Sequence, residues 1–255
     1  MYIDSHCHLD FPDLLANEAD VLAAMADAGV GRALCIGVKL ENIDRVIGLA
    51  ERHDHLYATV GVHPDGADVE EPDEARLLAL ADHPKVLGIG ETGLDYYWHK
   101  DRPEWQRERF RVHIRAARRC GKPLVIHTRD SAEDTLRLMR EERADEVGGV
   151  MHCFTESQAV ADAALALGFH ISFSGIVTFR SAKDLKEVAR SVPLDRMLIE
   201  TDSPYLAPTP YRGKTNQPAY VVHVAEEIAR LRELPVEVVA EATTRNFNRL
   251  FLKEH

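Results

Sequence analysis

The amino-acid sequence predicts an α/β protein with a TIM-like (β/α)8 barrel, formed as a single domain over residues 1–255. Short apolar runs alternate eight times with helical patterns, and these runs are nearly continuous, as expected for strands buried on both faces. The chain also has the length of one such barrel. An open doubly wound sheet is the competing fold, but its first strand usually leads into a phosphate-binding glycine turn. Here two histidines, His6 and His8, take that place.

Each predicted strand is a short run rich in apolar and β-branched residues. In chain order these runs are YIDSHCH (2–8), RALCIGV (32–38), LYATVGV (56–62), KVLGIGE (85–91), PLVIHT (123–128), GGVMHCF (148–154), FHISFSG (169–175) and RMLIETD (196–202). Amphipathic patterns predict helices over 17–28, 41–52, 73–82, 103–120, 131–142, 157–167, 181–191 and 218–233. A last helical piece over 235–252 is expected to lie outside the barrel core.

Composition and charge exclude several classes of protein. No apolar run approaches the roughly 18 residues of a membrane span and the N-terminus has no signal-like segment, so we expect a cytoplasmic protein that does not bind membranes. A net charge of −11 argues against broad adhesion to nucleic acid, so a nucleic-acid substrate must be held locally. Four widely spaced cysteines indicate neither a disulfide framework nor a thiolate zinc site. Nothing in the sequence indicates an obligate protein partner.

Metal-ligand residue types recur where the predicted strands end. In a barrel of this kind the carboxyl ends of the strands form the active site. The polar residues at those ends are His6, His8, Glu91, His127, His152 and Asp202. Histidine and carboxylate suit Zn, Mn, Co or Ni, whereas Mg prefers oxygen ligands. Six such residues without a thiolate fit two divalent ions better than one tetrahedral structural site.

The H-x-H spacing has a plain alternative interpretation. Residues i and i+2 of a strand point to the same face, so His6 and His8 can converge on one ion, but isolated surface histidines share this spacing. His53 and His55 repeat the spacing in charged surroundings between a helix and a strand, and we interpret them as surface residues.

Several segments together resemble the TatD family of metal-dependent hydrolases, which includes TatD-type deoxyribonucleases. They are IDSHCHLDF, GVHP, GIGETGLDYY, LVIHTRDS, MHCFT, ISFSG, LIETDSPYLAP, YRGKTNQP and RNFNRLF, and they span essentially the whole chain. The resemblance implies a TIM-like barrel, two divalent ions (Zn, Mg, Mn, Co or Ni) held by the six residues above, and hydrolysis, often of nucleic-acid phosphodiesters. Many amidohydrolase relatives bridge their metals with a modified lysine. Lys122 lies at the wrong edge for this role, so Glu91 is the expected bridge.

Two catalytic candidates follow. A metal pair lowers the pKa of bound water and polarises the bond under attack. Asp202 is the candidate general base and Glu91 the bridging carboxylate, while Glu200 is interpreted as a supporting acid behind them.

The segment GIGETG formally matches a dinucleotide-binding motif. That motif requires a helix to begin at its glycines, but LDYYWHKDRP follows here, so dinucleotide binding is rejected.

Residues that follow the strand ends are candidates for substrate binding. They are His63, Arg129, Tyr205, Arg212 and Lys214, with Asn216 in the same loop as the last two. The alternative for Arg129, Arg212 and Lys214 is that they are ordinary surface-loop residues. The alternative for His63 is that it only ends a strand ahead of Pro64. Tyr96, Tyr97, Trp98 and Trp105 could stack on bases, but aromatic residues after a barrel strand more often pack a lid.

Three functions remain. The leading hypothesis is a metal-dependent nuclease or phosphodiesterase, exodeoxyribonuclease-like, that acts on nucleic-acid ends or another phosphate-containing substrate. The alternative is ester or amide hydrolysis at the same metals, since the resemblance also covers members proposed to remove D-amino acids from tRNA. A non-catalytic binding module would show gaps among the six ligand positions, and the sequence has none.

Overall fold

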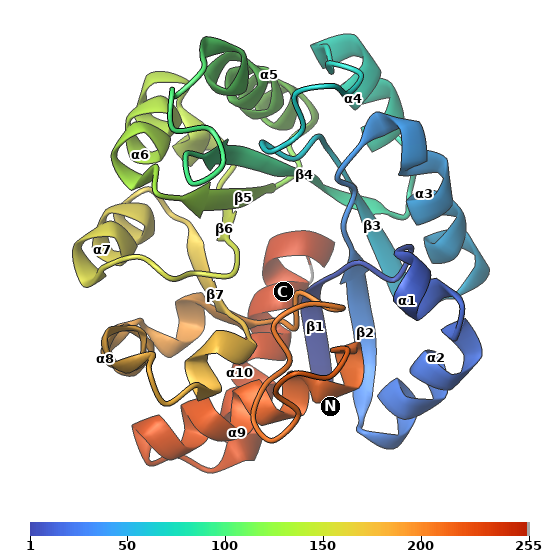
Figure 1. The fold of residues 1–255 in the computed structure, drawn as a ribbon, viewed down its shortest axis with the longest axis vertical. Helices are drawn as coiled ribbons and strands as arrows, with labels where there is room; N and C mark the ends of the chain where they lie inside the picture. Colours follow the sequence, from blue (N-terminus) through green and yellow to red (C-terminus); the bar gives the residue numbers. More distant parts are fainter. Residues whose placement is uncertain (254–255) are drawn as a thin grey trace.

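Eight parallel strands form the centre of the protein in a computed structural model, which describes residues 1–253. Neighbours in the sheet follow chain order from β1 to β8, and every paired neighbour is parallel. The strands are β1 (Tyr2–Cys7), β2 (Val30–Cys35), β3 (Leu56–Val60), β4 (Val86–Asp95), β5 (Leu124–Arg129), β6 (Gly149–Met151), β7 (His170–Phe173) and β8 (Met197–Ile199). Figure 1 looks down this nearly closed barrel, and the predicted fold is confirmed.

Helices surround the strands, as the alternating pattern predicts (Figure 1). They are α1 (Pro12–Leu15), α2 (Glu18–Asp27), α3 (Ile43–Arg52), α4 (Glu74–Ala81), α5 (Glu104–Cys120), α6 (Ala132–Glu141), α7 (Gln158–Ala166), α8 (Lys183–Ser191), α9 (Val221–Arg232) and α10 (Val236–Phe247). Short α1 was not predicted; Pro12 at its first position presets the helical φ angle. Among residues 1–253, no helix is both long and apolar enough to cross a membrane.

Strand β4 is longer than predicted, and this corrects the position of Glu91. The predicted strand ends at Glu91, but β4 continues to Asp95 because Gly93 pairs with His127 of β5. Gly93 has a φ of 138°, and a Cβ atom there would lie 1.9 Å from the His127 carbonyl oxygen. Only glycine fits this close approach. Glu91 therefore projects from within a strand, and Asp95 takes the place at its end.

The barrel closes between its first and last strands through a short seam. Cys7 and Ser203 form an isolated parallel bridge. The backbone N–H of Asp202 donates to the His6 carbonyl oxygen (2.9 Å), and that of His8 donates to the Ser203 carbonyl oxygen (2.8 Å). The seam thus places Asp202 beside His6 and His8, although Asp202 lies far from both histidines in the sequence.

The C-terminal helix does not lie outside the barrel core, contrary to the prediction. Helix α10 and the π-helical turn after it (Asn248–Leu252) lie across one end of the barrel (Figure 1). Two phenylalanines from this segment pack with residues of five strands and of the turn after β2 in one buried cluster: Ile3, Leu34, Ile36, Val125, Val150, Leu198, Phe247 and Phe251. Burying these rings removes apolar surface from water and stabilises the closed end.

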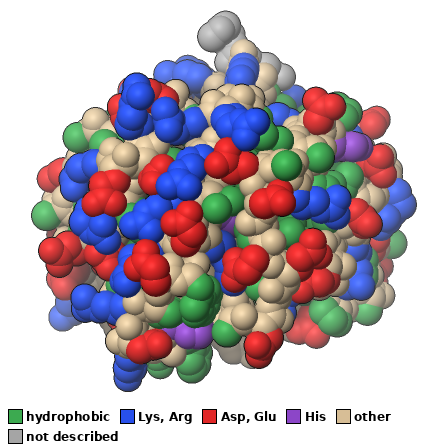
Figure 2. Space-filling model, turned by 90° about the horizontal axis from the view of Figure 1, so that it is seen from above, with side chains coloured by type: hydrophobic (Ala, Val, Ile, Leu, Met, Phe, Trp, Pro, Cys, Tyr) green, Lys and Arg blue, Asp and Glu red, His purple; other side chains and the backbone are tan. Residues whose placement is uncertain are grey.

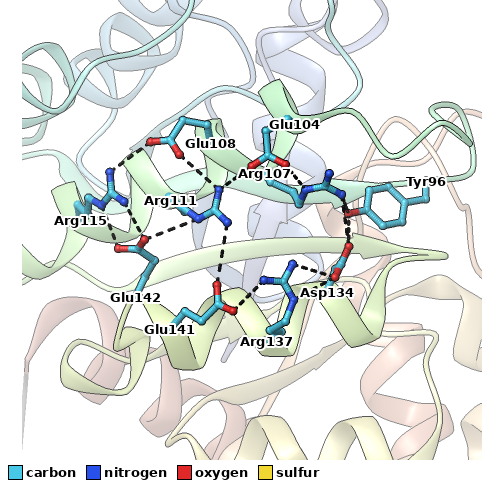
Figure 3. Close-up of polar contacts among 10 residues, drawn as sticks. All are labelled: Tyr96, Glu104, Arg107, Glu108, Arg111, Arg115, Asp134, Arg137, Glu141 and Glu142. Atoms are coloured by element: carbon cyan, nitrogen blue, oxygen red, sulfur yellow. Dashed lines mark hydrogen bonds and ion pairs between the residues drawn. The ribbon is translucent and has the colours of Figure 1, made fainter.

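Charged side chains of both signs cover the outside of the barrel. Figure 2 shows lysine and arginine mixed with aspartate and glutamate, without a large area of one sign on the face in view. On the α5–α6 face these charges form a connected network (Figure 3). Arg111, for example, lies 2.9 Å from Glu104 and 3.7 Å from Glu142. The network joins α5 to α6 and extends to Tyr96, whose hydroxyl donates to Asp134 (2.7 Å).

Candidate metal centre

The six predicted ligand residues converge at the carboxyl ends of the strands. Histidine and carboxylate atoms of this set lie within 4.8 Å of one another in overlapping groups that could hold a metal ion. Most come from the strand ends or the residues just after them, as the barrel topology requires. Their positions are His6 in β1, His8 after it, Glu91 in β4, His127 in β5, His152 after β6 and Asp202 after β8.

Glu91 lies at the middle of the centre, and its two carboxylate oxygens face different partners. Oε2 lies 3.3 Å from His6 Nε2. Oε1 lies 2.8 Å from His152 Nε2, 3.1 Å from His127 Nδ1 and 3.2 Å from His63 Nε2. One buried carboxylate therefore separates two groups of imidazoles.

Asp202 completes the group on the His6 side. Its Oδ1 atom lies 3.3 Å from His8 Nε2 and 3.6 Å from His6 Nε2. The residue has a left-handed backbone with a φ of 57°, a conformation that aspartate tolerates better than most residues. Its side chain is 16% exposed, compared with 3% for Glu91, so Asp202 is the more accessible carboxylate.

The geometry of these atoms fits divalent cations. Two donors bound tetrahedrally to one ion at about 2.1 Å lie about 3.4 Å apart. The separations of 3.3 and 3.6 Å around His6 and Asp202, and of 3.1 Å between His127 and Glu91, are of this size. Within the described residues, both ring nitrogens of buried His6 and Nε2 of buried His152 form no hydrogen bond, although Glu91 oxygens lie 3.3 and 2.8 Å from the two Nε2 atoms. A buried polar atom without a hydrogen bond costs free energy, and a metal ion between the imidazole and the carboxylate would satisfy it.

The charge state of the carboxylates supports the same interpretation. Burial alone would raise the pKa of Glu91, but His152, His63 and His127 outweigh it and hold that pKa well below its usual value. Burial is also outweighed at Asp202, where His8 and His6 lower the pKa. Both carboxylates are therefore anionic near neutral pH and available to a cation.

Two further acids hold imidazoles of the centre. His127 Nε2 lies 3.0 Å from Asp95 Oδ2, on the side of the ring away from Glu91. His152 Nδ1 lies 3.2 Å from Glu200 Oε1, which also accepts the backbone N–H of Cys153 (2.8 Å). Such partners orient a metal-binding imidazole and set its tautomer. Glu200 was expected in this role, but Asp95 was missed because the strand was predicted to end before it.

His63 lies closer to the centre than its predicted part in substrate binding requires. Its Nε2 atom is 3.2 Å from Glu91 Oε1, and its Nδ1 atom is 2.7 Å from Asp65 Oδ1. Burial alone would lower the pKa of His63, but Glu91 and Asp65 raise it to about 10. His63, Glu91 and His127 together form one of the groups that could hold a metal.

A cavity of about 810 Å³ opens onto the centre. Of the predicted substrate-binding residues, His63, Arg129 and Tyr205 line it. Arg212 and Lys214 are exposed and are not among the described residues of the lining; the Arg212 guanidinium lies 3.4 Å from the centre of the Phe179 ring. Their part in substrate binding stays a prediction. The lining also includes Lys39, which sequence reasoning missed.

The loop that carries Arg212 and Lys214 is held by a buried amide. Asn216 Nδ2 donates to the carbonyl oxygens of Thr201 (2.9 Å) and Tyr205 (2.6 Å). Asn216, which lies in the same loop, thereby holds the segment after β8 in place. The second H-x-H pair, His53 and His55, lies apart from the metal centre. His53 is partly exposed, and its Nε2 atom is hydrogen-bonded to Glu18 Oε1 (2.7 Å).

Comparison with known proteins agrees with this fold and site. The family model described as TatD related DNase matches residues 3–252. The metal-dependent hydrolase YcfH of Escherichia coli K12 is 48% identical over 256 residues, 98% of this chain and 95% of the relative. The metal-dependent hydrolase YabD of Bacillus subtilis is 43% identical over 252 residues, 98% and 99% of the two chains.

A solved structure extends the comparison to three dimensions. The TatD homologue YjjV of Escherichia coli superposes with a TM-score of 0.91 at 29% identity, over 98% of both chains. The family match, the curated relatives and this structural likeness cover nearly all of the sequence. The chain belongs to the TatD family of metal-dependent hydrolases.

Proposed function

We propose that this protein is a divalent-metal-dependent phosphodiesterase that cleaves nucleic acid at its ends with a metal-activated water. The observation that carries the proposal is the position of Glu91 between two groups of imidazoles, each group at distances that suit a shared ion. A family described as DNase supports phosphodiesters as the substrate class.

We divide the donor set between two ions. His6, His8 and Asp202 would hold one, His127 and His152 the other, and Glu91 would contribute one oxygen to each. His63 is a further donor for the second ion. A donor set of imidazoles and carboxylates suits Zn, Mn, Co or Ni better than Mg, which prefers oxygen ligands and water. When bound, such a pair polarises the phosphate and lowers the pKa of water toward 7.

The protein's own side chains then supply proton transfer and charge. Asp202 is the general base, because it is anionic and is the more accessible of the two carboxylates in the donor set, with 16% of its side chain exposed compared with 3% for Glu91. Arg129 and Lys39 are exposed cations on the cavity wall and would neutralise phosphate charge in a protein whose net charge is −11.

The test is a reconstitution assay. Protein stripped with a chelator is refilled separately with Mn, Zn, Co, Ni or Mg and incubated with oligonucleotides labelled at the 5′ or the 3′ end. The expected result is stepwise shortening from one end that requires metal. D-aminoacyl-tRNA is assayed in parallel, because release of the amino acid without cleavage of any oligonucleotide would replace the proposal with ester hydrolysis.

A further inference from the structure

The turn after β4 exposes two aromatic rings, one of which lines the metal-centre cavity. The relative exposures of Trp98 and Tyr97 are 64% and 42%, which is unusual for large aromatic side chains. Trp98 lines the cavity, together with Arg129 at the end of the neighbouring strand β5. The predicted lid packing therefore does not describe these two rings, although it describes buried Tyr96.

The same turn is fixed to the metal centre. Asp95 Oδ1 accepts the backbone N–H groups of Tyr97 (3.0 Å) and Trp98 (3.3 Å), while Oδ2 of the same carboxylate contacts His127. On the other side, the hydroxyl of Tyr96 is bonded to Asp134 of α6 (Figure 3). The exposed rings thus have a defined position relative to His127.

Arg129 forms part of the same surface. Its guanidinium lies 3.8 Å from the centre of the Tyr97 ring and 5.9 Å from that of Trp98, and the two rings meet edge to face at 4.8 Å. Among residues 1–253, no carboxylate lies within ion-pair distance of Arg129. Asp95 interacts with Arg129 electrostatically but does not pair with it. A cation fixed over one aromatic ring and without an ion pair in the described residues, beside a second exposed ring, suits a ligand that combines a flat ring with a phosphate.

We propose that Tyr97, Trp98 and Arg129, here called the stacking subsite, bind the nucleobase next to the phosphate that is cleaved. Trp98 stacks on the base, and Arg129 contacts the adjoining phosphate. This inference rests on the proposed function and adds to it the requirement for an unpaired base beside the scissile bond. Aromatic rings stack on any of the bases, so the subsite selects for the presence of a base and not for its identity.

The kinetic test compares a normal oligonucleotide with one that is abasic at the terminal or the penultimate position. For the metal-loaded enzyme, KM is expected to be about tenfold lower with the normal substrate, from the typical strength of base stacking. Trp98→Ala raises KM on the normal substrate to the abasic value without changing kcat, and Trp98→Phe restores most of the difference. Trp105→Phe, which changes the other tryptophan, keeps the wild-type difference.

A binding measurement separates this proposal from the proposed function. In Trp105→Phe, Trp98 is the chain's only tryptophan, so its fluorescence reports the subsite directly. Thymidine monophosphate is expected to quench it, and ribose 5-phosphate is not. Cleavage that is equally fast with and without the base would overturn the stacking subsite while the nuclease function stands. Quenching without any cleavage would overturn the nuclease function and keep the subsite.

Discussion

Asp95 Oδ2 lies 3.0 Å from His127 Nε2, and Glu91 Oε1 lies 3.1 Å from Nδ1 on the opposite edge of the same ring. An imidazole that donates its Nε2 hydrogen to Asp95 presents the lone pair of Nδ1 toward the centre. The tautomer of His127 is thus set by a residue that does not itself belong to the donor set.

Replacing Asp95 should therefore weaken metal binding without removing a ligand. In Asp95→Asn, we expect affinity for the ion on the His127 side to fall about 10- to 100-fold. Competition with a chromophoric chelator measures this affinity. The matched control is Glu51→Gln, which removes a carboxylate from surface His83 (3.0 Å) and should leave metal affinity unchanged.

Asp202→Asn tests the general base. The amide is nearly isosteric, so the fold and the unfolding temperature should be kept while single-turnover cleavage falls by about 10² to 10⁴. Cleavage is followed on a labelled oligonucleotide at saturating metal. Substantial metal-dependent activity in this variant would show that another group takes the proton.

The two H-x-H pairs of this chain form an internal comparison. Elemental analysis should find about two ions in the wild-type protein and about one in His6→Ala, because the group of His63, Glu91 and His127 does not include His6 and stays intact. The double variant His53→Ala/His55→Ala should keep both ions. A full metal content in His6→Ala would contradict the assignment.

Gln106 should be needed for both stability and activity. It is fully buried in α5, its Oε1 accepts the N–H of Asp95 (2.9 Å), and its Nε2 donates to the Pro64 carbonyl oxygen (2.7 Å). Gln106→Leu leaves both backbone groups without their partner, at about 1–3 kcal/mol each. We expect a lower unfolding temperature and lower kcat. Since Gln106 is not one of the donor residues, metal stoichiometry at saturation should stay unchanged, and loss of an ion would refute this positioning role.

Acid should destabilise the fold through His113 and His170. Burial lowers the pKa of each to about 4, helped by the charge of Arg109 at His113 and of Arg196 and Arg249 at His170. Below pH 6.5 the unfolded chain binds protons that the folded chain does not, so stability is lost as pH falls from 6.5 toward 4. The loss is about 3 kcal/mol for each residue.

Chemical denaturation of His170→Leu and wild type across this pH range checks the effect. The difference between the two free energies of unfolding should shift in favour of the variant as pH falls, because the variant lacks the group that takes up the proton. A difference that is constant from pH 7 to pH 4 would show that His170 does not contribute.

The sequence predicts the strands and the donor set for one physical reason. Parallel strands end at one edge, so residues such as His152 and Asp202, remote in sequence, can be brought together without knowledge of any contact. Positions that depend on local backbone geometry could not be obtained this way. Asp95 was missed because Gly93 resembles a strand terminator, yet it allows β4 to continue.

The sequence pattern of strands and helices also could not predict the direction of side chains in loops or the packing of the C-terminal segment. Arg212 follows β8 closely in sequence, but its guanidinium lies over the Phe179 ring, and it is not among the described residues that line the cavity. Helix α10 has the amphipathic pattern of an outer helix, whereas Phe247 packs against interior residues of the strands. Such contacts depend on the shape of the assembled barrel, and the periodicity of one sequence gives no information about that shape.

The seam between β1 and the segment after β8 has a consequence for biosynthesis. His6 and His8 leave the ribosome early, but Asp202, whose N–H bonds the His6 carbonyl oxygen, is translated only after most of the chain. A nascent polypeptide therefore lacks the complete donor group of His6, His8 and Asp202 until its last strand has docked. Hydrolytic activity would then arise late in folding, when β8 and the segment after it close the barrel.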